Sequence, residues 1–160
     1  MKTHPIPSTY YCEFTELVAA WPASVSLTNV AGDTFVEFLK HYHSIEAKWH
    51  GHLTADDIVT AAKLYAKLLV KTPLRGLLND KSEVTGDWSD ANDWLEFEWA
   101  PQVVHLGLRC MAHVYSENMF SRLSARDLKQ RVLPLLQMQN FDNRANAVTW
   151  LAQCLKTAKA

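Results

Sequence analysis

The hydrophobic positions of this 160-residue chain recur mainly at helical spacing, and no run of four or more residues alternates convincingly between apolar and polar positions. Residues 33–50 show the pattern best, because Asp33 supplies an N-cap, Gly51 supplies a helix end, and one broad apolar stripe lies between them. The stripe consists of Phe35, Phe38, Leu39, Tyr42, Ile45 and Trp49. The pattern predicts helices rather than strands.

Caps and prolines predict further helices along the chain. Residues 10–21 stop at Pro22, and a capping box at Thr54 and Asp57 opens a helix that ends at Pro73. The remaining predicted helices cover residues 88–99, 101–120, 124–139 and 142–156. Together they predict an all-α fold of about six or seven helices.

The segment 101–120 is expected to be the centre of this bundle. It is apolar over more than half of its helical circumference, which is typical of a helix covered by neighbours on several sides. Residues 1–9 are expected to form an extended N-terminal arm, and residues 79–93 an acidic loop around Gly86. We therefore predict one helical domain that spans residues 1–160.

Composition is that of a soluble globular domain, with 48% hydrophobic and 21% charged residues. The N-terminus leads into no apolar stretch of the kind found in signal peptides, and no apolar window is long enough to cross a bilayer. The three cysteines are an odd number without a CxxC motif, which disfavours a disulfide framework and fits a reducing compartment. These features predict a cytoplasmic protein without a membrane partner.

Charge is distributed unevenly beneath a net charge of −1. Residues 1–100 contain eight basic and fourteen acidic residues, whereas residues 101–160 contain eight basic and three acidic residues. Such asymmetry steers charged partners toward one side of a protein, unless the two halves neutralise each other within the fold.

Catalytic motifs are absent from the sequence. It contains no GxGxxG, no GxxxxGK[ST], no GxSxG and no HExxH. We therefore do not favour an enzyme, expect no cofactor, and do not expect a small-molecule substrate.

The histidine-rich tract at residues 40–52 is the chain's weak candidate for a metal site. On a helix, His43, Glu46 and His50 would lie within a narrow arc, and imidazole and carboxylate are ligands for Zn²⁺ or Fe²⁺. The outer pair would be too far apart for one ion, so only one pair could bind, with a further ligand from His105, His113 or Cys110. The alternative interpretation is structural, with Glu46 neutralised by a neighbouring histidine.

A basic stripe at Arg122, Arg126 and Lys129 is the candidate contact with nucleic-acid backbone. Its spacing places three cations on one helix face, where they match the charge of a row of phosphates. The same three residues are equally typical of a solvated helix face.

Aromatic side chains among acids form the candidate protein-binding site. Residues 87–99 form a segment rich in acidic and aromatic residues, which contains Trp88, Asp90, Asp93 and Trp94, and Trp150 lies on the last predicted helix. Tryptophans often anchor protein interfaces, but they also dock a helix onto its own core.

The C-terminal run from Ala147 to Ala160 resembles the terminal helix of the small subunits of all-helical CRISPR effector complexes. The resemblance covers fewer than 20 residues. It implies a helical subunit that lines a nucleic-acid complex.

These observations favour a non-catalytic helical interaction subunit or adaptor with protein partners and a contact to nucleic-acid backbone. One alternative is an acidic inhibitor or immunity-type protein that covers a cationic site. A second alternative is a metal-dependent helical enzyme that uses the histidine-rich tract.

Overall fold

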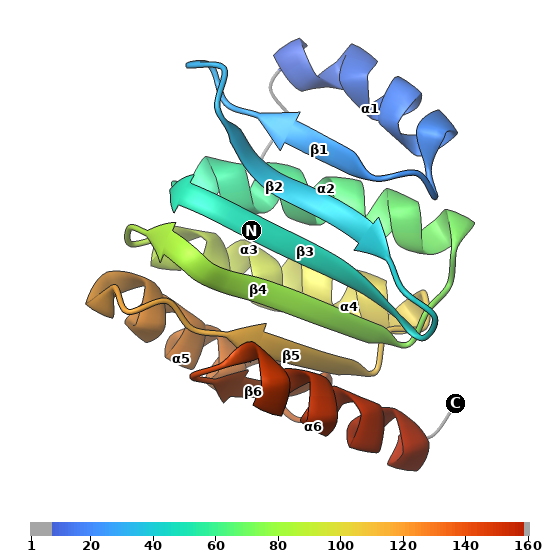
Figure 1. Ribbon diagram of the computed structural model, residues 1–160, viewed down its shortest axis with the longest axis vertical. Coiled ribbons are helices and arrows are strands. Elements are labelled where there is room, and N and C mark those ends of the chain that lie inside the picture. The colour runs from blue at the N-terminus through green and yellow to red at the C-terminus, as the bar shows by residue number, and fades with distance from the viewer. Residues whose placement is uncertain (1–7, 159–160) are drawn as a thin grey trace.

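The computed structural model describes residues 8–158, with side chains from Phe14 onward, and it shows a six-stranded sheet with helices on both faces (Figure 1). In chain order the elements are α1 (Ser8–Ala20), β1 (Val25–Thr28), β2 (Thr34–Lys40), β3 (Ser44–His52), α2 (Ala55–Lys71), β4 (Gly76–Thr85), the 3₁₀ turn η1 (Ser89–Ala91), α3 (Asn92–Trp94), the π-helical turn η2 (Leu95–Trp99), α4 (Ala100–His105), β5 (Cys110–Val114), α5 (Met119–Val132), β6 (Gln137–Phe141) and α6 (Arg144–Thr157). The fold is mixed α/β, and the predicted all-α bundle of six or seven helices is wrong.

The six strands follow one another across the sheet in chain order. The first three strands are antiparallel neighbours, whereas β3, β4, β5 and β6 run parallel. Parallel neighbours require a crossover connection, and α2, the η1–α4 segment and α5 supply the three crossovers. An antiparallel meander is thus followed by three β-α-β units.

Each face of the sheet has its own hydrophobic core. The larger core lies between the sheet and α2, the η1–α4 segment and α5, which Figure 1 shows behind the strands. The smaller core lies on the front face, where α6 covers β4 and β5 through Leu78, Ala112, Ala147 and Leu151. Helices α5 and α6 therefore lie on opposite faces of the sheet, and each contributes to a different surface of the molecule.

Strand β5 explains why residues 101–120 resemble a buried helix in sequence. All its residues are buried, since Met111 faces the larger core while Cys110 and Ala112 face α6. A strand covered on both faces is continuously apolar and does not alternate. The predicted central helix is therefore wrong beyond His105, where α4 ends.

Residues 33–50 form two antiparallel strands instead of the predicted helix. In β3, Ile45, Ala47 and Trp49 face the larger core, while Glu46 between them faces the other side. This alternation has the two-residue period of a strand. The mixture of apolar and polar residues also fits a helical stripe, which is why the sequence is ambiguous here.

The segments 79–93, 54–57 and 1–9 agree with the predictions to different extents. The acidic loop predicted at residues 79–93 is wrong except at residues 86–88, because β4 continues to Thr85 and the turn η1 begins at Ser89, followed by α3. The capping box is confirmed: Thr54 Oγ1 accepts from the Asp57 amide at 3.2 Å, and Asp57 Oδ2 accepts from the Thr54 amide at 3.0 Å. The predicted arm at residues 1–9 lies outside the described residues, apart from its last two, which begin α1.

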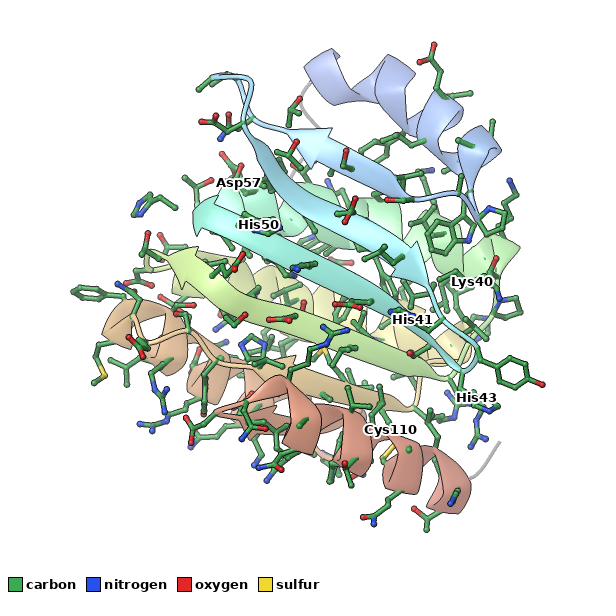
Figure 2. All side chains as sticks on the ribbon, in the orientation of Figure 1. Lys40, His41, His43, His50, Asp57 and Cys110 are labelled. Carbon is green, nitrogen blue, oxygen red and sulfur yellow. A yellow bond between two sulfur atoms is a disulfide. The ribbon has the colours of Figure 1, made fainter. Side chains whose placement is uncertain are left out.

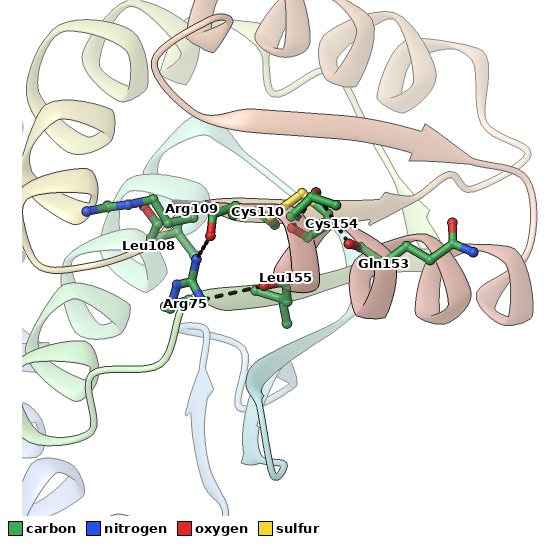
Figure 3. The surroundings of a disulfide bond; sticks show 9 residues. Arg75, Leu108, Arg109, Cys110, Gln153, Cys154 and Leu155 are labelled. Carbon is green, nitrogen blue, oxygen red and sulfur yellow. Dashed lines mark hydrogen bonds between the residues drawn. A yellow bond between two sulfur atoms is a disulfide. The ribbon is translucent and has the colours of Figure 1, made fainter. Parts of the chain in front are cut away.

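A disulfide bond joins Cys110 of β5 to Cys154 of α6 (Figure 3). The cysteine count therefore no longer supports the predicted reducing compartment, and a cytoplasmic location stays a prediction. None of the helices within residues 8–158 is both long enough and apolar enough to cross a membrane.

Candidate functional site

A groove of about 450 Å³ lies between the η1–α3 segment and α5. Most of its polar lining is carboxylate, and we call it the acidic groove. Its lining residues are Asp87, Ser89, Asp90, Asp93, Phe120, Leu123, Ser124, Asp127 and Arg131. Four carboxylates and one guanidinium give this lining a formal charge of −3.

Helix α5 supplies the apolar part of the groove. The helix begins at an Asn118 cap, whose Oδ1 accepts from the Ser121 amide at 3.1 Å. Its inner face is buried in the larger core, while Met119, Phe120 and Leu123 are 59%, 61% and 50% exposed. Apolar side chains gathered on one exposed helix face are typical of a contact surface.

Arg131 ties the two walls of the groove together. Its Nη1 donates to Asp93 at 2.6 Å and to Glu96 at 3.1 Å, and its Nε donates to Asp127 at 2.8 Å. Burial disfavours the cation, but these hydrogen bonds outweigh it and raise the pKa of Arg131. The guanidinium is therefore a fixed cross-link between α5 and the segment opposite.

Asp87 and Asp90 remain available as negative charges. Asp87 accepts from the hydroxyl and amide of Ser89 at 2.6 and 2.9 Å, and the hydroxyl contributes most to lowering the pKa of this carboxyl. Asp90 is exposed and forms no ion pair or hydrogen bond with the side chains that the structure describes, residues 14–158. The hydrogen bonds from Ser89 thus favour the charged form of Asp87, and both Asp87 and Asp90 face solvent.

The predicted partner-binding residues lie in three different environments. Asp90 and Asp93 line the acidic groove. Trp88 is fully buried and donates to Ser121 Oγ at 3.1 Å, and Trp94 is 6% exposed. Trp150 is half-buried on α6, 5.7 Å from the Phe141 ring. The first two tryptophans are therefore core residues and not anchors for a partner.

The basic stripe does not form a row of free cations. Arg122 donates to Asp142 at 2.8 Å and lies 4.3 Å from the Tyr115 ring, which Arg126 also approaches at 5.9 Å. Lys129 donates to Gln139 across to β6. Arg122 and Lys129 thus hold α5 against the β6 side of the molecule.

The histidine-rich tract is not helical, so its predicted arc does not exist. Glu46 and His50 lie on β3, and His43 precedes that strand in the turn from β2. Glu46 binds His41 and Arg144, while His50 pairs with Glu83 at 2.9 Å. Among the described side chains, which run from Phe14 to Ala158, no group of three or more His, Cys, Asp or Glu residues is arranged to hold a metal ion.

Arg131 and the apolar face of α5 were not predicted from the sequence. The reason is that the predicted helix 101–120 placed Phe120 at a helix end. A helix start at Asn118 would have placed Phe120, Leu123 and Asp127 on one face, at i, i+3 and i+7.

A buried polar cluster lies in the larger core beside this surface. Lys81 is 2% exposed, and its Nζ lies 3.5 Å from the centre of the Trp88 ring and 4.7 Å from that of Trp49. Asn79 accepts from Trp49 Nε1 at 2.6 Å and bonds His113 Nδ1 at 3.1 Å. Burial lowers the pKa of both Lys81 and His113 well below its usual value.

A family model described as SpoIIAA-like matches residues 44–152, from the first residue of β3 into α6, which is more than half of the chain. The chain belongs to the SpoIIAA-like family. Among solved structures, this SpoIIAA-like chain is similar to an uncharacterized protein of the DUF3478 family with a SpoIIAA-like fold from Shewanella loihica PV-4. The identity is 18%, the match covers 72% of this chain and 91% of that chain, and the TM-score is 0.43. No curated protein matches the chain.

SpoIIAA-like domains, which are of the STAS type, are often protein-interaction or regulatory modules. This assignment also corrects the resemblance of residues 147–160 to CRISPR small subunits, because α6 packs on a sheet and not within a helical bundle.

Proposed function

We propose that this SpoIIAA-like domain is a non-catalytic protein-interaction module that binds a basic amphipathic segment of a partner protein in the acidic groove. The observation that carries the proposal is the placement of exposed Phe120 and Leu123 beside four aspartates. Burial of the apolar side chains supplies affinity, and the carboxylates select a cationic partner and accelerate its association.

A helix laid in the groove fits this surface best. Such a helix inserts apolar side chains at i, i+3, i+4 and i+7 and flanks them with basic residues. Leu123 would contact the apolar positions, and Asp87 and Asp90 would meet the basic ones. Arg131 keeps the groove preformed, because its hydrogen bonds span both walls.

The structure bears on three other interpretations of the sequence. The acidic inhibitor or immunity-type protein would use this same surface, so it differs from our proposal only in what the partner does. Nucleic acid is not part of the proposal, because Arg122 and Lys129 already bind Asp142 and Gln139. The metal-dependent enzyme is left out because His43, Glu46 and His50 lie in separate contacts.

Isothermal titration calorimetry with an amphipathic Leu/Lys peptide of about 18 residues tests the proposal. Asp90→Lys and Leu123→Glu should each weaken binding by roughly tenfold or more, since one reverses a charge and the other removes apolar contact. The matched controls are Asp33→Lys and Val30→Glu, two exposed positions in the β1–β2 turn. Equal affinities across all four variants would contradict the proposal.

A further inference from the structure

A second groove, of about 550 Å³, lies on the opposite face of the sheet between α6 and the β2–β3 turn. We call it the α6 groove. Its floor is aliphatic and is formed by Leu74, Leu78, Val148, Leu151 and Leu155. A concave site of this volume, with an apolar floor and a few polar groups at its edge, has the dimensions of a small-ligand site.

The charged residues at the edge of the α6 groove are basic. None of the described residues that line it is acidic, whereas Arg75, Arg144 and Lys156 all line it. Glu46 and Asp80 of the sheet bind Arg144, at 2.5 and 3.1 Å. The formal balance of these five groups is +1. Because the two carboxylates gather at Arg144, the excess positive charge lies at Arg75 and Lys156.

Gly76 brings the basic end of the groove together. A Cβ atom at this position would lie 3.0 Å from Leu155 Cδ1 and 3.3 Å from the carbonyl oxygen of His43. The missing side chain therefore lets the β2–β3 turn and the end of α6 approach the start of β4. Figure 2 shows His43 at this end of the sheet, next to the C-terminal half of α6. Arg75 and Lys156 are the chain neighbours of Gly76 and Leu155, so they flank the same point.

Arg75 has a donor that is not used. Its Nη1 donates to the carbonyl of Leu155 at 3.5 Å and its Nη2 to the carbonyl of Ala158, so the guanidinium caps the end of α6 (Figure 3). Its Nε is buried and has no hydrogen-bond partner within the described chain. A buried N–H without an acceptor is costly, and a carboxylate entering beside Arg75 offers that acceptor.

We propose that the α6 groove binds a free amphipathic monocarboxylate, with the carboxylate at Arg75 and Lys156 and the alkyl chain over Leu78, Val148 and Leu151. The ligand would cover Val148, which is 46% exposed on α6 although it lies beside an apolar floor. The charge complementarity of the basic end selects an anion, and the aliphatic floor selects an apolar body. This site is separate from the acidic groove, which lies on the other face.

Calorimetric titration with decanoate, hexanoate and decanol measures what the alkyl chain and the carboxylate each contribute to affinity. Decanoate should bind with one-to-one stoichiometry, and each buried CH₂ should raise affinity by about fourfold relative to hexanoate. Decanol has the same chain without the charge, and it should bind at least about tenfold more weakly. Equal affinities for decanoate and decanol would overturn the proposal.

Variants locate the site. Lys156→Glu should weaken decanoate binding by roughly tenfold and Val148→Asp should abolish it, whereas Lys67→Glu on the exposed side of α2 is the matched control and should have no effect. Asp90→Lys should also leave decanoate binding unchanged, which separates this test from that of the acidic groove. A Lys156→Glu variant that binds like the control would overturn the site. So would a protein that ignores decanoate but sediments with anionic phosphatidylglycerol vesicles, because that result assigns the basic end to a membrane surface.

Discussion

Cys110 at the start of β5 is bonded to Cys154 in the last turns of α6, and this bond fastens the C-terminal helix to the sheet across the smaller core. The two cysteines are 44 residues apart in the chain, and the segment between them includes α5 and β6. Cross-linking a loop of this length restricts the unfolded chain considerably.

Removing the disulfide should therefore lower the free energy of unfolding by about 3–4 kcal/mol. Urea denaturation of the wild type with and without reductant measures the effect, and Cys110→Ser combined with Cys154→Ser should give the same loss without reductant. Reductant should have no further effect on the double variant. A wild-type transition that is insensitive to reductant would show that the bond contributes nothing to stability.

Arg144→Ala should destabilise the protein at neutral pH, because it leaves Glu46 and Asp80 on the sheet without their cation. Burial raises the pKa of the Glu46 carboxyl, but hydrogen bonds to Arg144 and His41 outweigh it and hold that pKa below its usual value. The stabilisation that ionised Glu46 contributes to the folded state is thus fully present above the usual carboxyl pKa. It is lost as the pH falls through the lowered pKa of the folded state. Since the Arg144 side chain is 47% exposed, we expect a loss of about 1–2 kcal/mol at pH 7 and a smaller loss near pH 3.

Lys81→Met should stabilise the protein. Burial lowers the pKa of Lys81 well below its usual value, so the unfolded chain binds a proton that the folded chain does not. The free energy of unfolding should therefore rise with pH between the lowered pKa and the unfolded value of about 10.4. The free energy of unfolding of the Lys81→Met variant should be about 1–3 kcal/mol higher than that of the wild type at pH 7. It should also no longer rise with pH over this range. Thermal unfolding checks it, with Lys67→Met as the exposed control. A destabilised Lys81→Met protein would mean that the contacts with Trp49 and Trp88 dominate.

His113 should make the protein sensitive to mild acid. Burial, and then the nearby charge of Lys81, lower the pKa of His113 well below its usual value. Below about pH 6.5 the unfolded chain binds a proton that the folded chain excludes, so stability falls as pH falls, by up to about 1.4 kcal/mol per unit. Chemical denaturation at pH 7, 6 and 5 measures this slope. His113→Gln should flatten it, and the exposed His52→Gln should leave it in place.

The helices that begin with a local signal could be predicted from the sequence. The capping box at Thr54 and Asp57 and the stop at Pro73 define α2 because their hydrogen bonds and steric effects act within one turn. Strand β5 could not be predicted in the same way, since burial on both faces removes the alternation that marks a strand.

The two grooves depend on contacts that the sequence does not display. Asp93 and Arg131 are 38 residues apart, and Glu46 and Arg144 are 98 residues apart, so only the order of the strands brings them together. The acidic character of residues 80–98 was visible, but the burial of Trp88 was not. The distribution of charge could thus be predicted from the sequence, whereas the exposure of each side chain depends on the fold.

The most direct measurement is an NMR titration of the ¹⁵N-labelled protein with the Leu/Lys peptide, in which amide shifts are followed residue by residue. The acidic-groove account predicts saturable shifts confined to residues 87–93 and 118–131, which disappear in Leu123→Glu. Shifts that instead follow α6 or the exposed strands of the meander, and that persist in Leu123→Glu, would contradict it.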